Sequence, residues 1–214
     1  MRSIAVALTV FVASALVALA QQAPASQPQT ASSMTGMRHH DHASGAPISF
    51  AELKDTVARL ERARQATAKY QDARVAEAAG YRAIGPDVPG MGIHYVLRVA
   101  QDGFDVEKPP ILLYEKNPAA PGGYSLVGVS YLLNAAEGPD GQPVNSPFPK
   151  SLALWHRHEN VCVLPDRTTP AGMSDEQCRQ KGGHFTAETQ WMVHAWIWKE
   201  SPLGVFSPTN PAVL

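Results

Sequence analysis

The chain has 214 residues and a formal net charge of −1, and its 18 Lys and Arg residues are scattered along the sequence. This pattern excludes a nucleic-acid-binding surface, which would need a concentrated basic face. Without the two N-terminal segments described next, about 165 residues remain, which is enough for one domain with a hydrophobic core.

The first 20 residues have the pattern of a secretory signal peptide. Arg2 supplies a positive start, a run of apolar and small residues follows from Ile4, and the run closes with a small-x-small cleavage signal at Ala18–Ala20. The alternative is a membrane anchor, but a run of about 17 residues is at the short limit for spanning a bilayer. We therefore expect cleavage after Ala20, a periplasmic or secreted mature protein, and no stable membrane anchor.

Residues 21–47 are rich in Gln, Ala, Ser, Thr and Pro and lack an apolar period, which predicts a disordered linker. This linker contains a Met/His cluster, which consists of Met34, Met37, His39, His40 and His42. Thioethers and imidazoles are ligands that suit copper, whereas the alternative interpretation is a solvated tail that is rich in histidine. Residues 48–214 are then expected to form a single globular domain.

A helix is predicted to begin after Ser49, because Ser49 and Glu52 have the spacing of a capping box. Apolar residues then recur at steps of three and four, and such a stripe is expected to pack on the domain. The stripe consists of Phe50, Leu53, Val57, Leu60, Ala63 and Tyr70, with Thr67 filling the gap between the last two. Asp72 has the position of a cap for a second short helix, which Gly80 ends.

Five strands are predicted after the helices from their β-branched and aromatic content. They cover residues 93–99, 111–115, 124–133, 151–164 and 190–198. The preceding passage, residues 85–92, is rich in turn residues and is expected to be a turn. Most connections are too short for crossover helices, so the fold class is α+β. We expect an N-terminal amphipathic helix, or a helix pair, packed on a mainly antiparallel, curled sheet of about five strands or on a small barrel.

The sequence contains two cysteines, Cys162 and Cys178. Disulfides persist outside the cytoplasm, where we expect this protein to be. The alternative is a pair of thiolate ligands, but their spacing is far wider than that of the close pairs in structural zinc sites. We therefore predict a disulfide bond.

Two histidines, His156 and His158, lie two residues apart in the predicted strand 151–164. Side chains at this spacing point to the same side of a strand, and this side also carries apolar neighbours. A neutral imidazole in such a place needs a hydrogen-bond partner or a metal ion. A curled sheet can bring His94 and His194 into the same concavity, and three or four imidazoles suit zinc, copper or iron. Taken singly, each histidine also fits an ordinary hydrogen-bonded core residue.

Two further kinds of residue are candidates for a site. Glu115, at the end of its predicted strand, is a candidate carboxylate ligand or a general base beside a metal-bound water. Four tryptophans flank the histidine-bearing strands, and they either line a ligand pocket or build the core. They are Trp155, Trp191, Trp196 and Trp198. The sequence has no nucleophile elbow, zinc-protease motif, phosphate loop or dinucleotide fingerprint.

The segments GMGIHY, LLYE, LVGVSY, WHRHENVC and MVHAWIW resemble a family of exported bacterial proteins that share a Gly-Met-Gly-x-His-Tyr segment and a late His-x-Trp segment. The resemblance covers residues 79–211. It implies that His94 and His194 belong to a shared pattern, and it implies no activity or cofactor.

The sequence therefore predicts an exported protein that binds one transition-metal ion. Its predicted ligands are His94, His156, His158 and His194. Copper is favoured over zinc because of the Met/His cluster and the oxidising compartment. Two alternatives stay open: a metal-dependent enzyme in which three histidines hold the ion and Glu115 is the base, and a metal-free module that binds a small molecule in a Trp-lined pocket.

Overall fold

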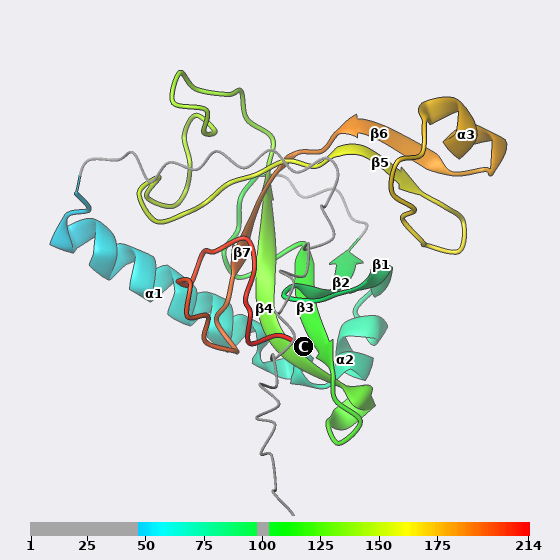
Figure 1. Cartoon of the computed structure of the whole chain (residues 1–214). Coiled ribbons are helices and arrows are strands. Elements are labelled where there is room, and N and C mark those ends of the chain that lie inside the picture. The colour runs from blue at the N-terminus through cyan, green and yellow to red at the C-terminus, as the bar shows by residue number, and fades with distance from the viewer. Residues whose placement is uncertain (1–46, 98–102) are drawn as a thin grey trace, which may run out of the picture. The chain divides into compact units, whose positions relative to one another are not determined.

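The computed structural model describes residues 47–97 and 103–214 (Figure 1). The predicted signal peptide and the Met/His cluster lie outside the described residues. The helices are α1 (Phe50–Thr67), α2 (Ala73–Ala78) and α3 (Asp175–Gln180), with the short 3-10 helices η1 (Ala68–Gln71) and η2 (Pro121–Gly123). The strands are β1 (Tyr81–Val88), β2 (Gly92–Leu97), β3 (Ile111–Lys116), β4 (Tyr124–Leu133), β5 (Glu159–Val163), β6 (His184–Glu188) and β7 (Trp191–Ala195). Within these ranges, no helix has both the length and the apolar content needed to cross a bilayer.

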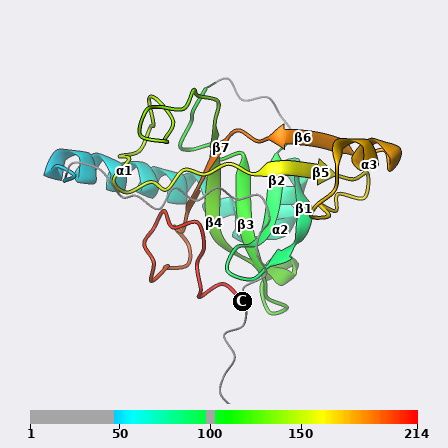
Figure 2. The same ribbon diagram turned by 45° about the horizontal axis from the view of Figure 1, so that its top comes forward.

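The predicted α+β class is confirmed. Five strands form one antiparallel sheet in the order β1-β2-β3-β4-β7, and β5 pairs with β6 in a separate two-stranded sheet (Figures 1 and 2). The five-stranded sheet is curled, and the helices α1 and α2 pack on one of its faces. It does not close into a barrel, because β1 and β7 are its two edge strands.

The observed strands differ from the predicted strands in two regions of the chain. Strand β1 contains Gly85 and Pro86, residues that indicate a turn, but both lie in a bulge of an edge strand. There Pro86 interrupts no regular pairing, and the backbone N–H of Gly85 donates to the carbonyl of Arg167 at 2.8 Å. The strand predicted for residues 151–164 is wrong in extent, since regular pairing covers only β5. This strand pairs with β6, which is not among the five predicted strands.

Helix α1 begins as predicted, with a complete capping box. The backbone N–H of Glu52 donates to the hydroxyl of Ser49 at 3.2 Å, and the backbone N–H of Ser49 donates to the carboxylate of Glu52 at 2.9 Å. Asp72 likewise caps α2 by accepting from the N–H of Arg74 at 3.0 Å. The local signals at both helix starts were therefore sufficient to place them.

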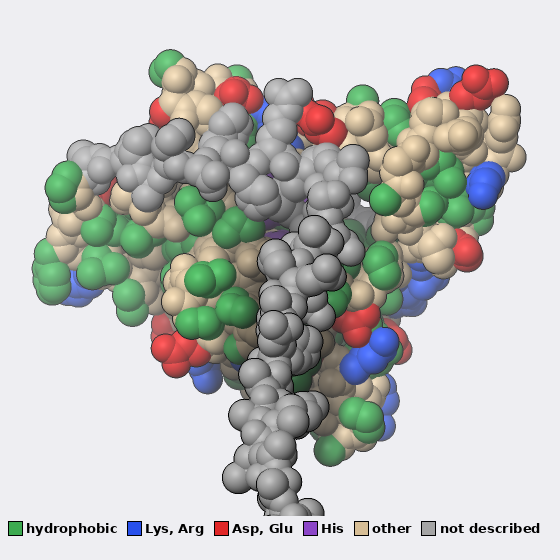
Figure 3. Space-filling view, in the orientation of Figure 1, with side chains coloured by type: hydrophobic (Ala, Val, Ile, Leu, Met, Phe, Trp, Pro, Cys, Tyr) green, Lys and Arg blue, Asp and Glu red, His purple; other side chains and the backbone are tan. Residues whose placement is uncertain are grey.

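The predicted apolar stripe of α1 is wrong in its first half. The side chains of Phe50, Leu53 and Val57 are 82%, 43% and 57% exposed, whereas Ala63 and Thr67 are fully buried. The first turns of α1 extend past β7 in both ribbon views, so they have no sheet beneath them (Figures 1 and 2). Apolar side chains gather over this end of the helix in the space-filling view (Figure 3).

The two faces of the five-stranded sheet carry different clusters, because alternate side chains of a strand point to opposite faces. In β3, Leu112 and Tyr114 point to the helix-covered face, and Ile111 and Leu113 point to the opposite face. The helix-covered face is rich in aromatic rings, including those of Tyr81, Tyr95, Tyr114, Tyr131, Trp191 and Phe206. The opposite face is smaller, and its buried apolar side chains are Ile111, Leu113, Val127, Met192, Trp196 and Val213.

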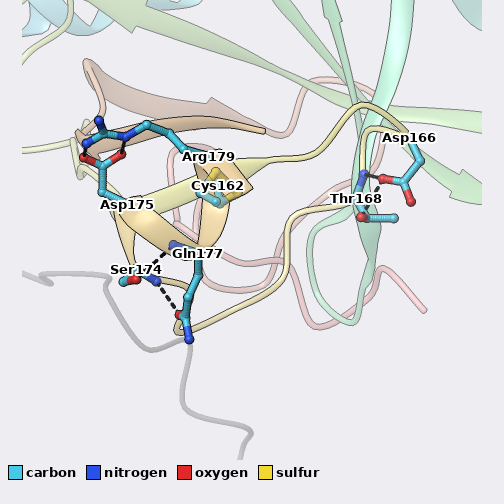
Figure 4. The surroundings of a disulfide bond; sticks show 8 residues. Cys162, Asp166, Thr168, Ser174, Asp175, Gln177 and Arg179 are labelled. Atoms are coloured by element: carbon cyan, nitrogen blue, oxygen red, sulfur yellow. Dashed lines mark hydrogen bonds and ion pairs between the residues drawn. A yellow bond between two sulfur atoms is a disulfide. The ribbon is translucent and has the colours of Figure 1, made fainter. Parts of the chain in front are cut away.

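The predicted disulfide is confirmed. Cys162 in β5 is bonded to Cys178 in α3, which ties this helix to the two-stranded sheet. Helix α3 has a capping box of its own at Ser174 and Gln177 and an ion pair between Asp175 and Arg179 (Figure 4). We call β5, α3 and β6 the disulfide arm. The disulfide and the caps of α3 hold this short, polar arm in a fixed structure.

Candidate metal centre

His94 and His194 reach the opposite face from two strands that are not neighbours. His94 in β2 pairs with Leu113, between Ile93 and Tyr95, which point to the helix-covered face. His194 in β7 pairs with Ser130 of β4. The alternation of both strands therefore places the two imidazoles on one face of the sheet, away from α1.

The close approach of these two rings follows from the curl of the sheet. Strands β3 and β4 lie between β2 and β7, and three strand spacings in a flat sheet would span about 14 Å. The ring centroids of His94 and His194 are only 5.6 Å apart. The histidine-bearing face is therefore concave, and side chains from its two sides meet over its centre.

The other two histidines reach the same place along the outer edge of β7. The backbone N–H of His156 donates to the carbonyl of Met192 at 2.9 Å, and the N–H of Met192 donates back at 2.7 Å. The N–H of Thr189 then donates to the carbonyl of His158 at 2.9 Å. The segment therefore continues the sheet by a short bridge, which holds both histidines in place without a long strand.

The four rings form a cluster. The ring centroids of His156 and His194 are 5.2 Å apart, as are those of His156 and His158. The side chains of His156 and His194 are buried, with 2% and 0% exposure, and those of His94 and His158 are partly buried. We call these four residues the histidine cluster.

The orientation of His194 is fixed by a backbone carbonyl. Its Nδ1–H donates to the carbonyl oxygen of Pro208 at 2.6 Å. A carbonyl can only accept, so Nδ1 holds the ring proton and Nε2 carries a lone pair. This buried Nε2 has no hydrogen-bond partner in the described part of the chain. Metal-binding histidines in proteins have this arrangement, with one ring nitrogen bonded to the backbone and the other available to the ion.

Burial keeps two members of the cluster, His94 and His194, in their neutral form. Burial, and then the proximity of His158, lowers the pKa of His94 to about 4. Burial also lowers the pKa of His194 well below its usual 6.5, and the neighbouring His156 and His94 lower it further. Both rings are therefore neutral at pH 7, which is the state in which imidazole binds a metal ion.

The spacing of the rings can be compared with that in a metal site. Nitrogen atoms about 2.0 Å from a tetrahedral ion place the ring centroids about 5 to 6 Å apart. The measured separations of 5.2 to 5.6 Å lie in this range. Nevertheless, in residues 47–97 and 103–214 no three His, Cys, Asp or Glu side chains are arranged so that they could hold an ion. The rings are close enough, but they would have to turn about their side-chain bonds before their nitrogens converge.

Glu115 lies in different surroundings. Its carboxylate is 2.6 Å from the Nζ of Lys199, and it lines a cavity next to Arg64 and Trp198, a cavity whose lining includes no histidine. The structure therefore does not place this carboxylate as a base beside the histidine cluster. His184, which we did not include among the ligands, is exposed and pairs with Val163 in the two-stranded sheet.

The tryptophans are mainly structural. Trp155, Trp191 and Trp196 are 2 to 3% exposed. Their indole N–H groups donate to Ser146 Oγ, the Ala135 carbonyl and the Ser207 carbonyl, respectively. Rings that are buried and hydrogen-bonded in this way do not form the walls of an open pocket. Trp198 is the exception, because it lines the cavity that contains Glu115.

Sequence reasoning missed two contributors to this region. The carbonyl of Pro208 orients His194, but a backbone group leaves no signal in the sequence. Met192 was not among the predicted ligands, although it lies on the same face and is 9% exposed. Because Met192 and His156 form a β-bridge, their side chains point in the same direction. The preference of copper for sulfur ligands is the signal that could have identified Met192 from the sequence.

No protein-family model, curated protein or solved structure matches the chain. The family resemblance inferred from the GMGIHY and MVHAWIW segments therefore stays a prediction. The case for a function depends on the geometry of the histidine cluster.

Proposed function

We propose that this is an exported protein that binds one transition-metal ion, copper in preference to zinc, through the histidine cluster. The observation that carries the proposal is the meeting of imidazoles from β2, β7 and the segment beside β7, with a buried lone pair on Nε2 of His194. A buried acceptor without a partner costs stability, and coordination of an ion would remove that cost.

Binding is better supported than catalysis. An enzyme of the predicted kind would need a base near the ion, and the candidate Glu115 is held by Lys199 in another cavity. Export is supported by the leader pattern of the first 20 residues and by the disulfide. The protein would therefore hold or carry the ion in the periplasm or outside the cell.

Metal content of the purified mature protein tests the proposal. Native mass spectrometry together with elemental analysis should find one equivalent of metal. The double variant His156→Ala/His158→Ala should retain none, while its far-UV circular dichroism remains that of the parent. His184→Ala is a matched control, because this exposed histidine lies outside the cluster and should not affect occupancy. Full occupancy in the double variant would contradict the assignment.

The preference for copper has its own test. Met192 places a thioether on the histidine-bearing face, and thioethers bind Cu(I) but are poor ligands for Zn(II). Met192→Leu keeps the volume and removes the sulfur, so it should weaken Cu(I) binding and leave Zn(II) binding unchanged. Equal effects on both ions would mean that the sulfur has no part in selectivity.

A further inference from the structure

A second feature, separate from the histidine cluster, is the cavity that contains Glu115 and Trp198. Its volume is about 850 Å³, within the range of small-molecule sites in proteins. It lies where the end of α1 and η1 meet the start of β4 and residues 198–199. Its polar lining is provided by Arg64, Lys69, Gln71, Asp72, Glu115, Ser125 and Lys199.

The charges of this lining do not balance. Glu115 is paired with Lys199 at 2.6 Å, and Asp72 is paired with Arg74 at 2.7 Å. Both carboxylates of the lining are thus already neutralised. Arg64 and Lys69 have no carboxylate within ion-pair distance among the residues that the structure describes. The cavity therefore has two cations available to an anion.

Arg64 is held in place before any ligand arrives. Its guanidinium lies 4.7 Å from the ring centroid of Trp198, and its Nη1 donates to the carbonyl of Ile197 at 3.0 Å. The indole N–H of Trp198 in turn donates to Oγ1 of the buried Thr67 at 3.1 Å. A guanidinium fixed on one side presents its remaining N–H groups to the cavity, in a geometry that fits two oxygens of a carboxylate or phosphate.

The uncharged groups of the lining indicate what else a bound anion would contain besides its charged group. The hydroxyl of Ser125 accepts from the Nδ2–H of Asn117 at 2.9 Å, which leaves its own proton free to donate. Next to these polar groups, Ala120, Pro121 and the ring of Trp198 form an apolar part of the lining. A ligand with one oxyanion and a compact apolar body would contact both parts.

We propose that this cavity binds a small organic oxyanion, a carboxylate or a phosphate monoester, with its charged group on Arg64 and Lys69 and its apolar body against Trp198 and Pro121. The site is independent of the metal proposal, since no histidine lines it. A protein with both features would bind a metal ion and a small organic acid at separate places.

Isothermal titration calorimetry on the full mature chain, with EDTA present, tests the site. The probes are benzoate and phenyl phosphate, which differ in the charged group, and acetate, which lacks the apolar body. We expect benzoate or phenyl phosphate to bind at least about tenfold more tightly than acetate, because the ring replaces water on the apolar lining. The proposal is overturned if no probe binds, or if acetate binds as tightly as the two aromatic probes.

Variants locate the binding. Arg64→Gln should weaken the tighter probe by about tenfold or more, because a fixed charge-assisted contact is lost. Arg62→Gln is the matched control, since Arg62 lies on the same helix but pairs with Glu107 outside the cavity. His156→Ala/His158→Ala should bind the probe like the parent chain.

A second variant keeps the test decisive if Arg64→Gln fails to fold. Lys69 contacts the ring of Tyr70 at 5.0 Å and is exposed, so Lys69→Gln should fold normally. A loss of affinity of a few fold would support the site, and unchanged affinity in Lys69→Gln or in a folded Arg64→Gln would overturn it.

Discussion

The two faces of the five-stranded sheet differ in what they bury. The helix-covered face buries aromatic and aliphatic side chains against α1 and α2, and its tyrosine hydroxyls donate to backbone carbonyls, as Tyr131 does to Val106 at 2.7 Å. The concave face buries His156 and His194 beside a smaller apolar cluster, and one ring nitrogen there has no partner within the described residues. The bonded tyrosine hydroxyls on the first face contribute to stability, whereas the unbonded Nε2 of His194 on the second face reduces stability in the absence of a ligand. We infer that the helix-covered face maintains the fold and the concave face serves the function.

Acid should affect the concave face most strongly. The pKa of His94 is lowered to about 4 and that of His194 is lowered well below 6.5, so the unfolded chain takes up protons that the folded chain does not. The free energy of unfolding of the metal-free protein therefore has its full value above pH 6.5 and decreases as the pH falls toward 4. In this pH range, each of the two histidines should add about 1.4 kcal/mol per pH unit to the slope of the unfolding free energy against pH.

Urea denaturation with EDTA between pH 7 and 5 measures this slope, above the range in which most carboxylates titrate. His194→Gln removes one titrating group and should flatten the profile, while His184→Ala should leave it as steep as in the parent. A parent profile that is flat from pH 7 to 5 would be inconsistent with neutral, buried imidazoles.

Neighbouring leucines on β3 allow a direct comparison of the two faces. Leu112 and Leu113 are both fully buried, but Leu112 packs on the helix-covered face and Leu113 on the concave face, where it pairs with His94. Truncation of either to alanine should lower the unfolding free energy by about 3 kcal/mol, since each leaves a cavity. Only Leu113→Ala should also change the metal affinity, which a competition titration with a chelator measures. An equal loss of metal affinity in Leu112→Ala would show that the division between the faces is not real.

The disulfide arm should contribute to the free energy of unfolding, but it should not affect the packing of side chains on either face of the five-stranded sheet. The double variant Cys162→Ala/Cys178→Ala releases α3 from β5, and the chain-entropy model gives a loss of about 3 kcal/mol. Because the main sheet contains neither cysteine, we expect the near-UV circular dichroism of its tyrosines and tryptophans to persist at low temperature. Loss of this signal would mean that the arm is needed to assemble the histidine segment beside β7.

The smallest effect should come from the exposed end of α1. Phe50 is 82% exposed, so Phe50→Ser removes little buried area and should change the unfolding free energy by less than about 0.5 kcal/mol. Ala63→Ser, on the buried part of the same helix, is the comparison and should be clearly destabilising. A loss above about 2 kcal/mol for Phe50→Ser would indicate that the stripe packs in solution as its periodicity predicts.

Local chemistry predicted much of this molecule from the sequence. The cap at Ser49, the limits of β4 and the Cys162–Cys178 bond depend on neighbouring residues or on simple pairing, and all three are confirmed. The prediction that the whole apolar stripe packs on the domain was wrong, because the sequence does not show how far α1 extends past the sheet. The edge strand β1 was missed because Gly85 and Pro86 are tolerated at an edge, which the sequence alone does not identify.

The histidine cluster was partly predictable. The two-residue spacing of His156 and His158 indicates a shared side, and the structure places their ring centroids 5.2 Å apart. The meeting of His94 with His194 needs the curl of the sheet, for which the sequence offers no measure. The pairing of Glu115 with Lys199 depends on the path of the chain after β7, beyond what strand periodicity describes.

The hydrogen bond from His194 to the carbonyl of Pro208 has a consequence for biogenesis. The two residues are 14 positions apart, so as the polypeptide emerges amino end first, His94, His156 and His158 all precede the group that orients the fourth ring. Correct loading of an ion would then have to await the arrival of that proline, which argues for insertion into the finished protein rather than into the nascent chain.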